Sequence, residues 1–132
     1  METILLSINP EYVEEILNET KKFEFRKRLA NKSVNLILIY ATLPIKKIVG
    51  EVQVIDTISA SPSALWETAK KKAGISRKKF REYFKGCKTA HAYCLGEVTR
   101  YASPKEITEF NINQPPQSFV YIEDKKYCNL DK

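Results

Sequence analysis

The stretch ILLSINPEYVEEIL, residues 4–17, changes midway from the pattern of a strand to that of a helix. Its first part alternates around large aliphatic residues, as a strand with one buried face does. Asn9 and Pro10 follow, and they suit the N-cap and the first position of a helix. We therefore expect a strand over residues 2–8 that leads directly into a helix over 10–17.

Outside this stretch, alternating or continuous apolar runs predict further strands, and capped amphipathic runs predict two more helices. The expected strands are 23–26, 34–42, 48–58, 90–98 and 119–122, and the expected helices are 63–72 and 77–85. Pro104 is expected to interrupt the chain. Because short links join most strands, the fold class is α+β, a mixed or antiparallel β-barrel of about five to six strands with flanking helices. We assign residues 1–123 to a single domain and 124–132 to a short polar tail.

The composition is that of a globular domain. The 132 residues are 43% hydrophobic and 29% charged, which excludes wholesale disorder. The longest apolar run, Leu36–Ala41, is far shorter than the roughly 18 residues of a membrane span, and the acidic N-terminus does not resemble a signal peptide. The cysteines lack Cys-x-x-Cys spacing, so we expect reduced thiols in a cytoplasmic protein at Cys87, Cys94 and Cys128.

The charge is unevenly distributed along the chain. Residues 67–88 hold nine Lys or Arg and two acids, a net +7, and residues 21–32 hold six against one, a net +5. The whole chain carries only +6, so the remainder is acidic. Such asymmetry favours a polyanionic partner. The alternative is that these basic runs are simply solvated surface.

Motifs for metal or cofactor chemistry are missing from the sequence. His91 is the single histidine, and no DxD, HExxH or glycine-rich phosphate loop occurs. We therefore expect no metal and no cofactor, and we interpret His91 as a hydrogen-bonded structural residue. Most enzyme classes that depend on a motif are excluded.

The segment KKFEFRK, residues 21–27, is the sharpest local feature. On a strand, Glu24 and Arg26 point to the same face, with Lys21 in the turn just before. A guanidinium makes bidentate contacts to phosphates or base edges, and a carboxylate can orient it or act as a base. The alternative is an exposed ion pair that contributes under about 1 kcal/mol.

The predicted helix over 77–85 forms the second candidate surface. Arg77, Arg81 and Lys85 are spaced i, i+4 and form a basic stripe that suits backbone phosphates. Tyr83 neighbours the stripe. It is either a platform for a stacked base or part of the core with a solvated hydroxyl.

Residues 4–17, followed by KKFEFRK, resemble the opening of an ASCH domain, a PUA-like barrel. Residues 77–86, 90–98 and 115–119 resemble the ASCH branch described as predicted transcriptional regulators. This similarity implies a barrel whose cleft binds RNA or a nucleoside, with Lys21, Glu24 and Arg26 along it. One departure is that Glu19 or Thr20 stands where the family usually has glycine, so the turn is expected to lack a left-handed residue.

The resemblance also implies possible chemistries. Some small ASCH proteins are acetylcytidine amidohydrolases that use a Lys, a Thr three residues later and a Glu before a later helix. Lys21 matches, but Glu24 occupies the Thr position, and residues 70–79 contain no carboxylate. The nucleophilic hydroxyl is therefore missing. A metal-independent ribonuclease activity, found in some members, is the other enzymatic option, with Lys21 and Glu24 as acid and base.

Three hypotheses follow. The leading one is a module that binds RNA, as a single-stranded segment or a modified nucleoside, in a basic cleft, with a role in transcription or translation regulation and no membrane contact. The alternatives are an enzyme acting on RNA or a nucleoside and a protein–protein adaptor. The expected nucleic-acid contacts are Lys21, Lys22, Glu24, Arg26, Arg77, Lys78, Arg81 and Tyr83.

Overall fold

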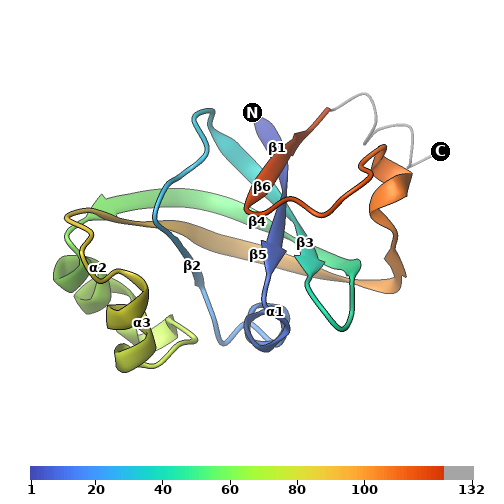
Figure 1. Ribbon diagram of the computed structural model, residues 1–132. Coiled ribbons are helices and arrows are strands. Elements are labelled where there is room, and N and C mark those ends of the chain that lie inside the picture. The colour runs from blue at the N-terminus through green and yellow to red at the C-terminus, as the bar shows by residue number, and fades with distance from the viewer. Residues whose placement is uncertain (124–132) are drawn as a thin grey trace.

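The computed structural model describes residues 1–123, which form a six-stranded mixed sheet with helices packed against it (Figure 1). Residues 124–132, assigned above to a polar tail and including Cys128, lie outside the described residues. The elements in chain order are β1 (Glu2–Ile8), α1 (Pro10–Leu17), β2 (Phe23–Arg26), β3 (Val34–Ala41), β4 (Lys47–Ala60), α2 (Pro62–Ala69), η1 (Lys70–Lys72), α3 (Arg77–Tyr83), β5 (Ala90–Lys105), η2 (Ile107–Phe110) and β6 (Phe119–Ile122).

The strand order is β2-β5-β4-β3-β1-β6, so β2 and β6 are the edge strands and the sheet is not closed. The pair β1–β3 is parallel and the other pairs are antiparallel. The expected α+β class, with a mixed sheet of about five to six strands and flanking helices, is confirmed, and the sheet is open where a barrel was expected. Although β1 and β2 are distant in the sheet order, the sheet curves enough that Arg26 Nη2 donates a hydrogen bond to the Ser7 carbonyl at 2.9 Å.

Two apolar clusters fix the helices on this sheet. Val13, Ile16 and Leu17 of α1 pack into the main core with β1, β3 and β4. The second cluster joins α2 and α3 to β2 and β5, and in it Phe80 and Phe25 meet edge to face with ring centroids 5.0 Å apart. Figure 1 shows α2 and α3 together at one end of the long β4–β5 ribbon, with η2 at the other.

The prediction that Pro104 interrupts the chain is wrong, because β5 continues to Lys105. The pairing of β4 with β5 shifts register between Ile48 and Gly50, whose partners are Lys105 and Arg100. Proline is tolerated at such irregular positions of a strand, where no ladder hydrogen bond is required from it. The η2 turn was not predicted. The helix expected over 77–85 is shorter than expected and ends at Tyr83.

Candidate functional site

A cleft of about 570 Å³ opens between the end of β1, helix α1, strand β2 and helix α3. It lies where the curved sheet brings β2 back toward β1. We call it the central cleft, and it is lined by Ser7, Ile8, Asn9, Glu11, Tyr12, Lys21, Glu24, Phe25, Arg26, Ile75, Lys79, Glu82 and Tyr83. The structure thus brings Lys21, Glu24, Arg26 and Tyr83 together from separate elements.

Lys21 reaches this cleft through the turn that ends α1. The backbone N–H groups of Thr20 and Lys21 donate to the Glu15 carbonyl, at 2.9 and 3.0 Å. Glu19 has φ 64°, so it supplies the left-handed residue that the sequence was expected to lack. A non-glycine residue takes this conformation because the hydrogen bonds around it over-determine the turn.

The Lys21 amine is buried in the wall of the cleft. The residue is 2% exposed, and its Nζ donates to the Ala73 carbonyl at 2.7 Å. The same Nζ lies 4.6 Å from the ring centroid of Phe25 and 5.3 Å from that of Tyr12. Desolvation lowers the Lys21 pKa to about 8, against the opposing attraction of Glu24. Near pH 8 this lysine therefore gives or takes a proton readily.

Glu24 and Arg26 form a partly buried pair at the floor of the cleft. Arg26 Nε and Nη2 both donate to Glu24 Oε2, at 3.1 and 2.8 Å. The side chain of Glu24 is 8% exposed and that of Arg26 is 16% exposed. The alternative of a solvent-exposed ion pair is therefore wrong. The pairing fixes Arg26 in one orientation between β2 and β1.

Tyr83 is packed on the core on one side and exposed to the cleft on the other. Its ring packs edge on against Phe84, at a centroid distance of 4.8 Å, while the residue stays 37% exposed and lines the cleft. Partial burial raises the pKa of its hydroxyl. With Tyr12 and Phe25, it gives the cleft aromatic surfaces on which a flat ligand can stack.

The lining of the cleft is balanced in charge, so the expected basic cleft is not found at this position. Its cations are Lys21, Arg26 and Lys79, and its carboxylates are Glu11, Glu24 and Glu82. The pattern that α3 presents here is Lys79, Glu82 and Tyr83, an i, i+3, i+4 set. Sequence reasoning chose the neighbouring stripe of the same helix and so missed Glu82 and Lys79, as well as Glu11 and Tyr12 on α1.

The other predicted contacts lie away from the central cleft. Arg77 and Arg81 line a separate space between α2 and α3, which we call the α2–α3 hollow, and Lys78 is exposed beside them. Lys22 is paired with Glu19, with Nζ and Oε1 3.1 Å apart. The two basic segments therefore do not form one continuous surface inside the cleft.

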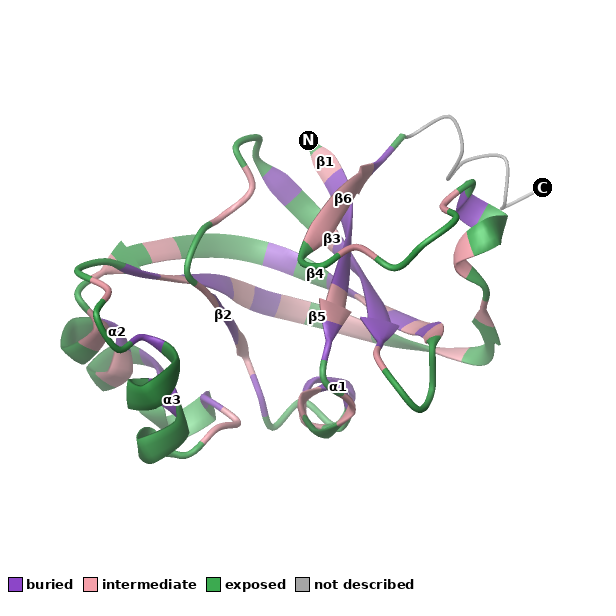
Figure 2. Ribbon diagram, in the orientation of Figure 1, coloured by how far each residue is buried: buried purple, intermediate pink, exposed green. Residues whose placement is uncertain are grey.

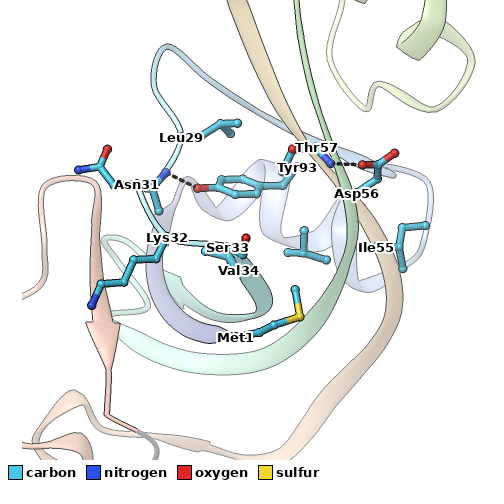
Figure 3. Close-up of a pocket in the computed structure, with 12 residues that line it drawn as sticks. Met1, Leu29, Asn31, Lys32, Ser33, Val34, Ile55, Asp56, Thr57 and Tyr93 are labelled. Atoms are coloured by element: carbon cyan, nitrogen blue, oxygen red, sulfur yellow. Dashed lines mark hydrogen bonds between the residues drawn. The ribbon is translucent and has the colours of Figure 1, made fainter.

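A further hollow, of about 320 Å³, lies between the β2–β3 connection and β4. Figure 3 shows Tyr93 extending into it. The Tyr93 hydroxyl accepts a hydrogen bond from the Ala30 N–H at 2.9 Å. Asp56 accepts the N–H of Thr57 at 2.8 Å in the same space. These polar groups bond to the protein itself, and no residue predicted from the sequence as a site lies here.

His91, Cys87 and Cys94 lie outside the central cleft. His91 Nδ1 and Ser59 Oγ are 2.7 Å apart, which confirms the expected hydrogen-bonded histidine. Within residues 1–123, Cys87 and Cys94 are free thiols, and no group of His, Cys, Asp and Glu is arranged to hold a metal ion. No helix in this part of the chain is long and apolar enough to cross a membrane.

A curved mixed sheet whose helices enclose a cleft with a buried lysine defines an α+β domain of the PUA-like class. The family is more specific: the model of the ASCH domain matches residues 6–115, and the chain belongs to this family. The structure of ASCH from Zymomonas mobilis superposes with a TM-score of 0.90 at 26% identity, covering 98% of this chain and 94% of that one. The N-terminal domain of Staphylothermus marinus McrB, at 13% identity and a TM-score of 0.60, shares the fold.

Relatives are found in two bacteria. A Zymomonas mobilis protein named ASCH domain-containing ribonuclease is 29% identical, over 96% of this chain and 88% of the relative. In Ureaplasma parvum, proteins named ATP synthase subunit alpha and large ribosomal subunit protein uL22 are 33% and 30% identical over 92% of this chain. This chain spans only 15% and 39% of their lengths, so each contains a long region without a counterpart here.

Proposed function

We propose that this ASCH domain binds single-stranded RNA and places one base in the central cleft beside Lys21. The observation that carries the proposal is the buried Lys21 amine, which lies among aromatic rings in a cleft that the Arg26 guanidinium also lines. Hydrogen-bond donors next to aromatic surfaces are what proteins use to read unstacked bases. The volume of about 570 Å³ is within the range of small-ligand sites.

The relatives support RNA as the nucleic acid. One is named a ribonuclease, and another carries a similar segment within a large ribosomal subunit protein. Arg77 and Arg81 on α3, which have no ion-pair partner within residues 1–123, provide an electrostatic contribution that the charge-balanced cleft itself does not.

The binding test compares two adjacent lysines. Lys21→Met removes the buried amine, whereas Lys22→Met removes a surface amine paired with Glu19. We expect Lys21→Met to weaken binding of a labelled single-stranded RNA by about tenfold or more, and Lys22→Met to have little effect. Equal effects of the two variants on affinity would contradict the assignment of the cleft. Absence of RNA binding at low salt would contradict the function and favour the adaptor hypothesis.

A second function, RNA cleavage, is favoured by the position of the Lys21 amine, which is buried in the wall of the cleft, where desolvation lowers its pKa to about 8. A neutral amine there would take the proton of a 2′-hydroxyl, the 2′-oxygen would attack phosphorus, and the bond to the 5′-oxygen would break as that oxygen gains a proton from water. The RNA recovered after binding decides between the two functions. Cut RNA with a rate that rises toward pH 8 and is lost in Lys21→Met would establish the enzyme, and intact RNA would establish the binding module.

A further inference from the structure

The α2–α3 hollow, of about 410 Å³, lies on the other side of α3 from the central cleft. Helix α3 turns Lys79, Glu82 and Tyr83 toward the cleft, and Arg77 and Arg81 toward the hollow. Figure 2 shows that α3 is exposed over most of its surface, and Phe80 is its buried residue. One short helix therefore separates two open sites.

The hollow has an aromatic base. Trp66 is half-buried, and its ring lies 5.0 Å from that of Phe80 at an interplanar angle of 50°. Phe80, which is 1% exposed, supports the tryptophan from the core and itself packs on Phe84, while Trp66 lines the open hollow. An indole held in this way offers a flat surface for stacking, worth about 1–3 kcal/mol per base by alanine substitution in single-strand binding proteins.

The rim of the hollow is cationic. Arg77 and Arg81 are exposed and one turn apart, and within residues 1–123 no carboxylate lies at ion-pair distance from either guanidinium. Glu67 also lines the hollow, but its Oε2 is bound to Lys70 Nζ at 2.8 Å. Two unpaired guanidinium groups beside an indole are complementary to a phosphodiester carrying a base.

We propose that the α2–α3 hollow is a second nucleotide subsite for the RNA strand whose base occupies the central cleft. Trp66 stacks one base of the strand, and Arg77 and Arg81 bind the phosphates on either side of it. An α-helix with its side chains is about 10 Å wide, a distance that a strand of a few nucleotides crosses. The subsite rests on the proposed function, because the same strand must enter the cleft.

Trp66 is the single tryptophan of the chain, which makes its fluorescence a direct reporter of the subsite. We expect a single-stranded hexanucleotide to quench this fluorescence as it binds, because a stacked base quenches an indole. A mononucleoside, which fills the cleft alone, is expected to leave it unchanged.

The matched variants remove two charges each. Arg77→Gln/Arg81→Gln removes the rim, and Lys46→Gln/Lys105→Gln removes two cations at the opposite end of the β4–β5 ribbon. Loss of two phosphate contacts reduces the single-strand salt slope by about 1.4, which corresponds to about 25-fold in affinity at 0.1 M salt. We expect the arginine variant to lose this much affinity for the hexanucleotide and none for the mononucleoside. The lysine variant should lose only a little affinity for the hexanucleotide.

The outcomes separate the two proposals. Hexanucleotide binding without tryptophan quenching, or equal losses in the two double variants, would overturn the subsite and leave the central cleft in place. Absence of binding by any RNA at low salt would overturn the proposed function itself.

Discussion

Gly74 is the residue at which a single methyl group tests the placement of Lys21. A Cβ at this position would lie 2.4, 2.6 and 2.9 Å from Cβ, Cγ and Cδ of Lys21. Contacts this short do not occur, so in Gly74→Ala either the lysine or the loop has to move. The neighbouring Ala73 carbonyl accepts the Lys21 Nζ–H, so movement of either partner also weakens that hydrogen bond.

Gly86 provides the matched control. Both glycines have positive φ, 64° and 81°, but a Cβ on Gly86 would meet no atom within 4 Å. The left-handed backbone costs an L-residue about 1–2 kcal/mol, and this cost is common to both variants. Gly74→Ala adds the overpacking against Lys21, typically about 1–3 kcal/mol. We expect Gly74→Ala to lower the free energy of unfolding by that amount more than Gly86→Ala does.

The decisive assay is the pH dependence of Lys21 modification by an amine-reactive reagent, followed by mass spectrometry of the peptide. In the wild-type chain and in Gly86→Ala, the midpoint is expected near the pKa of about 8. In Gly74→Ala, the displaced amine regains water, and its pKa is expected to rise toward 10.5, the value for an unperturbed lysine. An unchanged midpoint in Gly74→Ala, together with equal stabilities of the two variants, would refute the reasoning.

Three further predictions concern the same cleft. Because the pKa of Lys21 is lower in the folded chain than in the unfolded one, the unfolded state binds more protons between pH 8 and 10.5. The free energy of unfolding of the wild type, measured in urea relative to Lys21→Met, should therefore rise over that window by up to about 3 kcal/mol. A difference that does not change with pH would contradict the burial of the charge. Glu24→Gln leaves the Arg26 guanidinium without a countercharge and should lower the free energy of unfolding by about 3 kcal/mol. Glu14→Gln, in an exposed pair with Arg100, should change it by under about 1 kcal/mol. Similar unfolding midpoints in denaturant for the two variants would count against the partly buried pair. In an anisotropy titration, Tyr83→Ala should weaken RNA binding by about 1–3 kcal/mol, and Tyr83→Phe should retain it because the ring remains. Loss of binding in both variants would show that the hydroxyl, rather than the ring, makes the contact.

Local patterns in the sequence were sufficient for much of the fold. The alternation in 23–26, the apolar run 119–122 and the helix start at Asn9 and Pro10 predicted elements whose positions the structure reproduces. These signals depend on neighbours within a few residues, so they can be read without the fold. The continuation of β5 past Pro104 depends on a register shift against β4, a property of the pair of strands that one strand does not reveal.

The site was predictable only in part, for the same reason. The common face of Glu24 and Arg26 follows from strand geometry, and their hydrogen bonds confirm it. The burial of Lys21 depends on the loop at Ala73, which is distant in sequence. Helical spacing alone does not show which face of α3 borders the cleft, so the cleft residue Glu82 was missed. The signal that could have found it is its i+3 relation to Lys79 beside Tyr83.

The most direct test of the account is photo-crosslinking of a single-stranded RNA that carries one 4-thiouridine, with the crosslinked residues identified by mass spectrometry. We predict crosslinks at Tyr12 and Tyr83, the two tyrosine rings that line the central cleft, and their loss in Lys21→Met but not in Lys22→Met. Crosslinks confined to other surfaces, and unaffected by Lys21→Met, would contradict the claim that this cleft holds an RNA base.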